Sequence, residues 1–548
     1  MDVNKQNTPV DEPVSALAAE ILEDIRHQVH NTGIDFAEGN GKQLINEIFD
    51  IAQGNLERYL SGCNSESWLL EAYKQLFMWT AVYRGMPNQS FLSPKEFGPV
   101  GRFGWRFVIE YLVSKKQADV PQRRKPSFED VKKVFTVLSV MANAAEWSNA
   151  LHFFPDVYGK ISFDLSTPYG ILLPILSEES NSRLSERSQY MRATDGKCWS
   201  ILTDGRISLD ENIIKAKLSN AILKAKGFSL EQIDKIIDTL LQKVLTSGFV
   251  LIIPGEYLIA WISDESGISA PTVAKVLDFM LLSTVQFGDD QAKFLDKKDP
   301  ARMINFAGIK ITDLKFLTSI YPKQSVSKSH IKNSSWHVIV NIFLVGEWYD
   351  ILKHRCATGQ RLDLKRDTSL NLALEAIEQY QRKNIFESVV TDIFLRAGYT
   401  SIQGIRKLAM GEGRPMLLPC GEIDVLAFDI RTNILYVVEC KASTPATDIR
   451  GQFQQYKDHF SQKNYDKKFK LKIRWVTENL KVISDKKELH MKQAKISETR
   501  VVPLLVTRYP SIVKFYSTEY RVLTYAELYQ ELVCSNTKSQ DQSNPLHC

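Results

Sequence analysis

The 548-residue sequence lacks several features that would place it in a large, easily recognised class of protein. Its seven cysteines are scattered and include no CxxC pair, so we expect reduced thiols in a cytoplasmic protein and no disulfide framework. The most apolar run, Phe249 to Ile262, is interrupted by Pro254-Gly255-Glu256 and is too short to span a bilayer. The opening MDVNKQNTPVDEP has no apolar core and does not resemble a signal peptide. We therefore expect no membrane association.

The sequence also lacks a nucleotide-binding loop and a strong excess of charge. The segment GNGKQ (39–43) resembles the end of a phosphate loop, but no glycine lies five residues before Gly41, and Gln43 stands where Ser or Thr is required. We therefore expect no ATP site in this chain. The net charge of +5 is small for this length, so a nucleic-acid footprint would have to be a local patch. The lysine-rich stretches 463–472 and 481–493 fit such a patch and fit ordinary solvated faces equally well.

The pattern that is present divides the chain into a helical part and a mixed part. Up to about residue 365 the apolar spacing is mainly helical, and Ser127 followed three residues later by Asp130 marks one helix start. A Ser- and Arg-rich break near 177–210 leaves two lobes open within this region. The expected divisions are a disordered tail (1–14), a mainly helical region (15–365, with possible lobes 15–180 and 205–365), an α/β domain (370–534) and a second disordered tail (535–548).

Beyond residue 370, helix-like and strand-like segments alternate, which is typical of an α/β domain with a central mixed sheet. The β-branched runs 420–429 and 433–443 are joined by the turn IRTN and predict a hairpin, and a helix ending at Gly398 precedes them. The other expected elements are a loop (400–419), two helices (448–460 and 524–532) and two strands (469–479 and 500–510). The predicted fold class is therefore multidomain, with a largely α-helical N-terminal region and a C-terminal α/β domain.

Three residues of the predicted hairpin suggest phosphodiester chemistry. Asp424 and Glu439 are fifteen residues apart, so a hairpin folds them back side by side, and Lys441 shares the face of Glu439 because side chains alternate along a strand. Mg²⁺ is bound through one or two carboxylates plus substrate phosphate and water. An ammonium beside it can orient the attacking water and offset the charge of the transition state.

This spacing of acids and lysine is a weak signal without its context. About one chance match is expected in a chain of this length. Asp119 with Asp130-Val131-Lys132 is such a match, but it lies in a helical stretch, where residues i and i+2 point apart. The hairpin match lies in two apolar strands, where a buried charge is costly unless it has a function. A plain surface salt bridge between Glu439 and Lys441 is the alternative interpretation.

The sequence GEID…VVECK resembles the catalytic core of the PD-(D/E)xK nuclease superfamily, which has the restriction-endonuclease-like fold. Two flanking segments share this resemblance. Phe386-Glu387 and Gly398-Tyr399 are similar to the FE…GY pattern of Mrr-like nucleases. Gln452 and Tyr456 match the Q-x-x-x-Y motif of RecB-type nucleases, one helical turn apart. No proline directly precedes Asp424, and the loop 400–419 is longer than a minimal core of this fold needs.

The resemblance implies a role for each matching residue. Asp424, Glu439 and the backbone carbonyl of Cys440 would bind Mg²⁺ or Mn²⁺, and Glu387 would complete or support that site. Lys441 would position the nucleophilic water. Gln452 and Tyr456 would steady the lysine or touch a phosphate. Solvent exposure of Glu387, and plain packing of the Gln452–Tyr456 helix against the sheet, are the simpler readings.

A second candidate for nucleic-acid contact lies near 262–282. A glycine turn at Gly267 followed by a helix beginning near Pro271 is typical of a helix-turn-helix, and two ordinary packed helices give the same pattern. In the first reading Ser269, Thr272 and Lys275 would face DNA.

The sequence thus predicts a cytoplasmic, metal-dependent DNA endonuclease of PD-(D/E)xK type, with Mg²⁺ or Mn²⁺ as cofactor, DNA as partner, and a homodimer or partner protein left open. The resemblance implies cleavage that leaves 5′-phosphate ends, in a restriction or phage-defence role with an N-terminal recognition or regulatory region. The alternative is a nucleic-acid-binding or partner-activated subunit whose N-terminal module senses a signal and whose nuclease domain is silent alone.

Overall fold

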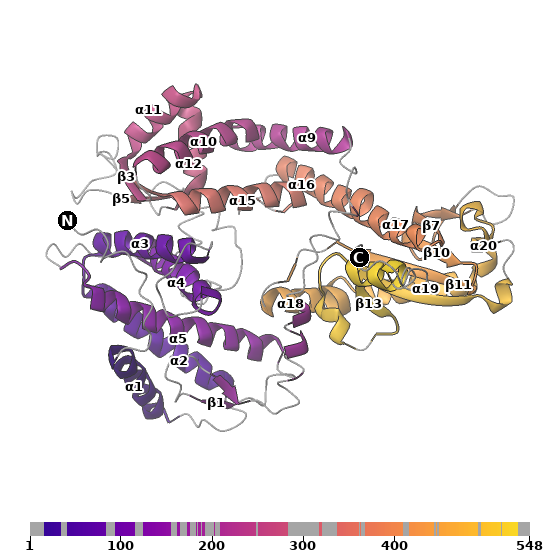
Figure 1. Cartoon of the computed structure of the whole chain (residues 1–548), viewed down its shortest axis with the longest axis horizontal. Coiled ribbons are helices and arrows are strands. Elements are labelled where there is room, and N and C mark those ends of the chain that lie inside the picture. Colours follow the sequence, from indigo (N-terminus) through magenta and orange to yellow (C-terminus); the bar gives the residue numbers. More distant parts are fainter. Residues whose placement is uncertain are drawn as a thin grey trace, which may run out of the picture. The chain divides into compact units, whose positions relative to one another are not determined.

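The structure is a computed structural model in which the chain forms two compact units (Figure 1). The first comprises Met1–Ser177 and Ala216–Leu372, and the second comprises Glu178–Lys215 and Ala373–Cys548. The structure describes residues 16–33, 41–83, 94–114, 124–154, 162–164, 173–175, 182, 185–187, 189–191, 202, 209–247, 250–282, 317–320, 337–360, 362, 368–408, 416–442, 445–446, 449–491, 495–516 and 518–534. The two predicted tails lie outside these residues.

The first unit begins with a group of helices around a core of large aromatic side chains. Trp68, Trp79 and Trp105 are fully buried, and the Trp79 ring stacks on Phe135 at 5.2 Å between centroids. Gly101 lies so close to the Trp79 ring that any Cβ would clash with it, which explains glycine at this point. The elements are α1 (Ala16–Asn31), α2 (Gly41–Ser61), α3 (Ser65–Tyr83), α4 (Pro94–Ser114), α5 (Phe128–Phe153), β1 (Ser162–Asp164) and β2 (Leu173–Ile175).

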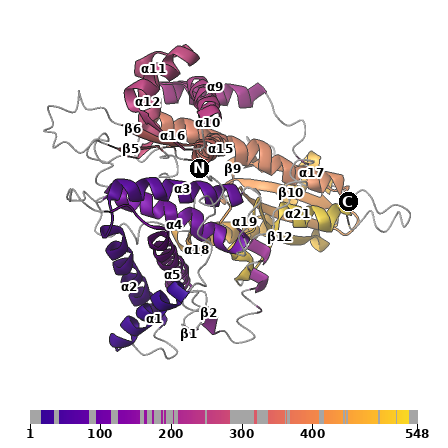
Figure 2. The same ribbon diagram turned by 60° about the vertical axis from the view of Figure 1, so that its left-hand side comes forward.

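The first unit also contains a small sheet with helices. Its strand order is β3-β6-β5-β4, and Figure 2 shows α10, α11 and α12 near strands β5 and β6. The apolar run 249–262 becomes the strand β3 and the helix α11. The elements are α9 (Leu209–Lys226), whose residues before Ala216 belong to the second unit, α10 (Leu230–Ser247), β3 (Val250–Pro254), α11 (Gly255–Ser266), α12 (Ala270–Met280), β4 (Leu281–Leu282), β5 (Leu317–Ile320), β6 (His337–Asn341) and α15 (Ile342–Thr358).

The second unit is built on a mixed sheet of five strands in the order β13-β12-β11-β10-β7. Strands β7, β10 and β11 are antiparallel, whereas β12 runs parallel to β11 and β13 parallel to β12. The strands are β7 (Thr400–Ile405), β10 (Ile423–Asp429), β11 (Ile434–Lys441), β12 (Arg500–Thr507) and β13 (Arg521–Thr524), with a separate hairpin of β8 (Lys407–Leu408) and β9 (Met416–Leu417). The coarse prediction of a largely helical N-terminal region and an α/β domain with a mixed sheet is therefore confirmed.

Helical segments accompany this sheet along the chain. Before it come α16 (Thr368–Tyr380), the π-helical η4 (Gln381–Glu387) and α17 (Ser388–Arg396), and the predicted stop Gly398 has a φ of +82°. The later segments are α18 (Ile449–Lys457), η5 (Asp458–Gln462), α19 (Tyr465–Glu478), α20 (Leu480–Ser484), η6 (Lys487–Leu489), η8 (Ile496–Glu498), η9 (Ile512–Phe515), α21 (Tyr525–Tyr529) and η10 (Gln530–Cys534).

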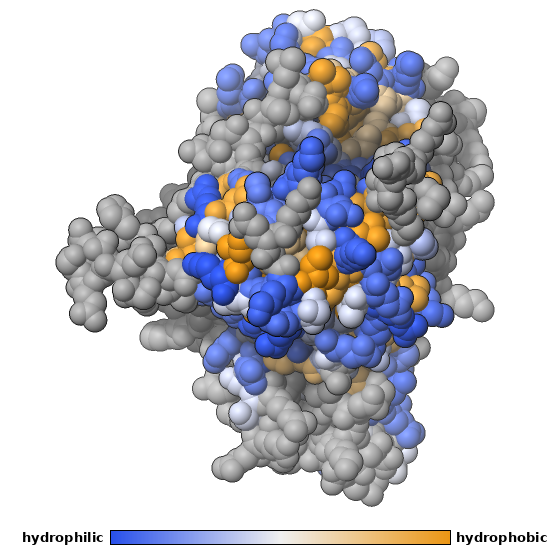
Figure 3. All heavy atoms as spheres, turned by 90° about the vertical axis from the view of Figure 1, so that its right-hand side faces the viewer, coloured by the Kyte–Doolittle hydropathy of each residue, from blue (hydrophilic) through white to orange (hydrophobic). Residues whose placement is uncertain are grey.

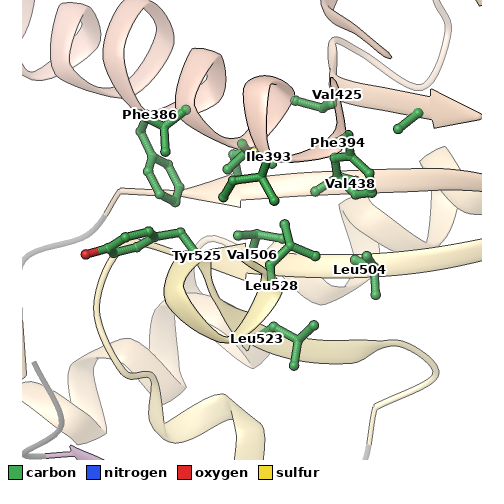
Figure 4. Packing of buried hydrophobic residues seen from close by; sticks show 14 of the residues in the cluster. Phe386, Ile393, Phe394, Val425, Val438, Leu504, Val506, Leu523, Tyr525 and Leu528 are labelled. Carbon is green, nitrogen blue, oxygen red and sulfur yellow. The ribbon is translucent and has the colours of Figure 1, made fainter. Parts of the chain in front are cut away.

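Each face of the sheet carries its own apolar core, as strand alternation requires. On one face Val425, Val438 and Val506 meet side chains of α17 and α21, including Phe394 and Leu528 (Figure 4). On the other face the alternate strand residues pack against α19 and the segments that follow it. That second cluster includes Leu426, Val437, Leu505, Phe469 and Val476. Even residues of β10 and odd residues of β11, the positions of Asp424, Glu439 and Lys441, therefore belong to the α19 face.

Two element predictions for this unit are wrong. Residues 469–479 were expected to form a strand because Phe469, Leu471, Ile473 and Trp475 alternate with polar residues, but they lie in the helix α19. Leu471 is exposed, and the buried positions 469, 472 and 476 follow helical spacing. The expected loop 400–419 contains β7, which pairs with β10 along the sheet edge, together with β8 and β9.

The second unit also contains residues that the sequence placed in a break between two N-terminal lobes. Leu202 is buried in the same core cluster as Phe386 and Val425. Tyr190 packs edge-on against Phe515, with 5.5 Å between the ring centroids. The segment Glu178–Lys215 therefore belongs to the unit of the sheet.

No helix among the described residues is long and apolar enough to cross a membrane. Figure 3 shows one face of the molecule. Among the described residues on this face, most are hydrophilic, and the hydrophobic ones form small separate groups. The apolar side chains of the second unit are mainly gathered in the two clusters that flank its sheet.

Candidate active site

The three residues predicted to carry the chemistry lie together at one end of the β10–β11 hairpin. The last paired residues at that end are Val425 and Val438, so Asp424 and Glu439 are the next pair to face each other. Glu439 and Lys441 share one face of β11, and Lys441 Nζ lies 2.6 Å from Glu439 Oε1. The hairpin predicted from the turn IRTN thus brings the two acids and the lysine into one site.

Asp424 is held by the main chain of the neighbouring strand. Its Oδ2 accepts a hydrogen bond of 2.8 Å from the backbone N–H of Cys440. The carbonyl of a strand residue points to the same side as its own N–H, so the Cys440 carbonyl also turns toward β10. The Oδ1 atom of Asp424 remains directed toward another side chain, Lys472, whose Nζ lies 3.8 Å away.

Lys472 is a site residue that the sequence analysis missed. It lies on α19, is buried, and places its Nζ 2.5 Å from Glu439 Oε2. A buried lysine at this position could not be recognised while residues 469–479 were expected to form a strand. Once that segment is helical, Lys472 falls on the same stripe as Phe469 and Val476, and a lysine on a buried stripe requires an anion beside it.

The pKa values of the two acids are shifted in opposite directions. Burial alone would raise the pKa of Glu439, but the charges and hydrogen bonds of Lys441 and Lys472 outweigh it and lower that pKa. The pKa of Asp424 is raised instead, because burial and the nearby charge of Glu439 raise it more than the two lysines lower it. Burial would lower the pKa of Lys441, but the charge of Glu439 raises it. Glu439 is therefore the more firmly ionised of the two acids.

Glu387 approaches the same end of the sheet from the π-helical segment η4. Only 2% of its surface is exposed. Burial, followed by the charges of Asp424 and Glu422, raises its pKa to about 7, and Arg382 Nε lies 3.9 Å from its carboxylate. The simpler reading of Glu387 as a solvent-facing helix residue is therefore not what the structure shows.

The donor set suits a hard divalent ion with few protein ligands. Among the described residues, no three or more His, Cys, Asp or Glu side chains are arranged to hold a metal ion together. Asp424 Oδ1, Glu439 Oε2 and the Cys440 carbonyl nevertheless offer two carboxylates and one carbonyl, which is the kind of partial set that Mg²⁺ accepts. Glu387 lies close enough to influence Asp424 but does not complete a trio, so its position fits support of the site better than direct binding.

Gln452 and Tyr456 lie on α18, one turn apart as predicted, but the contacts found for them do not include Lys441. Gln452 Oε1 accepts a bond of 3.4 Å from Arg187, and Tyr456 packs among aromatic rings, with 4.7 Å between its centroid and that of Tyr516. The ring that lies beside Lys441 is instead Tyr465, at 4.3 Å from Nζ to the centroid. The rings outside α18 that lie around Tyr456 come from η5 and from the residue after η9, so they differ from the packing against the sheet that was the simpler alternative.

A buried polar chain lies behind the site. His459 Nε2 is 2.5 Å from the Tyr520 hydroxyl, and that hydroxyl donates to Asp466 Oδ1 at 2.8 Å. Because the tyrosine proton is directed to Asp466, His459 must donate through Nε2–H. Burial lowers the pKa of His459 to about 4, so this imidazole is neutral near pH 7.

Basic side chains surround the Glu387 side of the site. Glu422, two residues before Asp424, pairs with Lys383 Nζ at 2.7 Å and with Arg406 Nε at 3.0 Å. Arg382 and Arg406 keep 44% and 58% of their side-chain surface exposed. Exposed guanidinium groups beside these carboxylates are suited to a polyanion that approaches the acids.

The helix-turn-helix candidate lies in the first unit. Helices α11 and α12 are joined at Gly267, which has a φ of +67°, and Val273, Val276 and Leu277 are buried. Ser269 and Lys275 are exposed and Thr272 is half-buried, and the Ser269 and Thr272 hydroxyls are 2.9 Å apart. The Lys275 ammonium lies beside Gly227, at the end of α9. DNA contact by these three residues stays a prediction.

No protein-family model, curated protein or solved structure matches this chain.

Proposed function

We propose that the second unit is a metal-dependent nuclease of the PD-(D/E)xK type, which hydrolyses phosphodiester bonds of DNA. The observation that carries the proposal is the pair of buried acids at facing positions of β10 and β11, with Lys441 2.6 Å from Glu439 on the same face. Charges in such a position are costly unless they have a function. A mixed sheet with the acids on two antiparallel strands is also in keeping with the restriction-endonuclease-like fold.

The residues that would hold the ion are Asp424, Glu439 and the Cys440 carbonyl. A bound Mg²⁺ or Mn²⁺ would supply Lewis-acid stabilisation of the phosphate oxygens and lower the pKa of a bound water. The Cys440 N–H fixes the Asp424 carboxylate in one orientation, with Oδ1 directed toward Lys472 Nζ, 3.8 Å away. A main-chain donor cannot rotate away as a side chain can, so it holds the acid in place.

Lys441 has the geometry of a water-positioning residue. Its ammonium is anchored by Glu439 on one side and lies beside the Tyr465 ring on the other. Only about a fifth of its side chain is exposed, so it cannot range freely in solvent. It remains protonated near pH 7, because the charge of Glu439 raises its pKa, and can therefore stabilise negative charge on a phosphate oxygen.

The exposed basic residues next to the acids favour a nucleic acid over a small phosphate ester. Arg382 pairs with Glu387, and Arg406 and Lys383 both pair with Glu422, so three basic side chains lie next to the acids. A polyanion that spans several phosphates can contact the acids and these residues at once. A role in restriction or defence against invading DNA is part of the proposal by resemblance only.

The test is cleavage of plasmid, linear duplex and single-stranded DNA by the full-length protein with Mg²⁺, Mn²⁺ or EDTA. Asp424→Asn should remove the activity. Asp429→Asn is the matched control, because Asp429 is a buried acid at the other end of β10 that accepts hydrogen bonds from Arg431 and Thr432.

Metal-dependent cleavage by the wild type and by Asp429→Asn, with loss in Asp424→Asn, would support the nuclease. If folded wild-type protein cleaves none of these substrates with any metal, the proposal fails for the isolated chain. A partner-activated subunit then becomes the better reading, and residues 366–548 alone should be assayed next.

A further inference from the structure

Lys472 lies where the two acids of the site offer their remaining oxygens. Asp424 Oδ2 is taken by the Cys440 N–H, and Glu439 Oε1 is taken by Lys441. The other two oxygens, Asp424 Oδ1 and Glu439 Oε2, are 3.8 and 2.5 Å from Lys472 Nζ. The ammonium of Lys472 is therefore directed at the same two atoms that a divalent cation would need.

The position of Lys472 on α19 leaves its ammonium no comparable alternative among the described contacts. Its neighbours on the buried stripe, Phe469 and Val476, are apolar, and only about a tenth of the lysine side chain is exposed. An ammonium enclosed in this way is stable only next to anions. The stem of Lys472 thus crosses the layer between α19 and the sheet, and its charge ends at the acids.

When both acids are ionised, the two negative charges of Asp424 and Glu439 are balanced by the two positive charges of Lys441 and Lys472 before any metal enters. Glu387, whose pKa is raised to about 7, adds at most part of a further negative charge near pH 7. A divalent ion within bonding distance of Asp424 Oδ1 and Glu439 Oε2 would lie next to the Lys472 ammonium, where like charges repel strongly because water is largely excluded. Lys472 and the ion cannot both hold these oxygens in the present geometry.

We infer that Lys472 is an internal competitor for the divalent cation, so that this chain binds metal weakly until Lys472 gives up the two acids. The inference rests on the proposed function, since it concerns how the nuclease acquires its cofactor. A DNA phosphate at the site supplies Lys472 with another anion and adds the negative charge that a third cation requires. Metal binding is then coupled to DNA binding, so the site holds metal weakly and cleaves little when no DNA is bound.

The test is calorimetric titration of the full-length protein with Ca²⁺, which takes the same carboxylate and carbonyl oxygens as Mg²⁺. Lys472→Met keeps the apolar stem and removes the charge, and should bind Ca²⁺ at least about tenfold more tightly, the value of one charge-assisted hydrogen bond. Lys472→Gln should change affinity in the same direction. Lys472→Arg keeps the charge and should bind no more tightly than the wild type.

Lys467→Met is the matched control, because Lys467 lies on the same helix but is exposed. It should bind Ca²⁺ like the wild type. Circular dichroism and thermal unfolding establish that each variant is folded, and Lys472→Gln serves if Lys472→Met does not fold.

Ca²⁺ binding by the charge-neutral variants that equals or falls below that of the wild type would overturn the inference, and so would an absence of binding in every protein. Tighter binding with no DNA cleavage by any folded protein would instead leave Lys472 as a competitor and refute the nuclease. Failure of the inference and failure of the proposed function are thus separated in one set of samples.

Discussion

Asp130-Val131-Lys132 on α5 and Glu439-Cys440-Lys441 on β11 have the same spacing of acid and lysine, but their backbones differ. On the helix, Asp130 turns back to cap its own first turn, accepting from the Ser127 N–H at 2.7 Å and from Arg124, while Lys132 lies over the Phe128 ring at 5.0 Å. On the strand, Glu439 and Lys441 meet at 2.6 Å. The helix satisfies its acid locally, whereas the strand holds two charges at an end of the sheet where a substrate could reach them.

The sharpest test of this comparison exchanges each lysine for alanine. Lys441→Ala should slow DNA cleavage at least about 100-fold, since it removes a positioned charge from the site. Lys132→Ala should leave the rate unchanged. Single-turnover cleavage with Mg²⁺ measures both, and equal rates for the two variants would remove the distinction between helix and strand.

The next effect is on stability. Glu439→Gln leaves Lys441 and Lys472 with one acid fewer in a largely buried place, so the second unit should lose about 3 kcal/mol. Adding Lys472→Met should recover part of this loss, because it removes the uncompensated charge. Amide hydrogen exchange of β10 and β11 reports the local free energy of opening. A double variant as unstable as Glu439→Gln would mean that Lys472 and Glu439 are not energetically coupled.

His459 makes the stability of the strand site depend on pH. Its folded pKa of about 4 lies below the ordinary value, so between these two values the unfolded chain binds a proton that the folded chain does not. The contribution of His459 to stability should therefore fall as the pH drops, by about 2 kcal/mol from pH 7.5 to pH 5, whereas Glu387 and Asp424, whose pKa values are raised, contribute in the opposite direction. His459→Gln removes only the first contribution, so the difference in stability between wild type and variant should change by about 2 kcal/mol over that range. Exchange rates of strands β11 and β12 across that range measure it, and an unchanged slope in the variant would assign the dependence to other groups.

The smallest expected effect is at the helix. Asp130→Ala removes half of the capping box with Ser127 and should destabilise the start of α5 by about 1 kcal/mol. DNA cleavage should not change. Hydrogen exchange of the first turns of α5 provides the measurement. A loss of cleavage in this variant would show that the helix acid contributes to function after all.

The hairpin site was predictable because its determinants are local in sequence. Strand alternation places Glu439 and Lys441 on one face, and the turn at 430–433 sets the register that brings Asp424 opposite Glu439. The helix start at Ser127 was predictable for the same reason. In each case the residues that decide the structure lie within one turn or one hairpin.

Lys472 was not predictable from the hairpin, because it reaches the acids through packing of a helix far along the chain. The run FKLKIRWV alternates as a strand would, and only its docking against the sheet selects the helix, with 469, 472 and 476 inside. The edge strand β7 depends likewise on pairing with β10. No short sequence pattern indicates which distant segments of a chain will contact each other.

At position 440 the backbone and the side chain have separate roles: the N–H holds Asp424, and the side chain packs in the apolar core. The Cys440 side chain is fully buried among the apolar residues on the opposite face, with Val425 and Val438. Another small apolar side chain could therefore replace the Cys440 side chain without loss of the backbone hydrogen bond that orients Asp424. The one residue barred from this position by that hydrogen bond is proline, which has no N–H to donate.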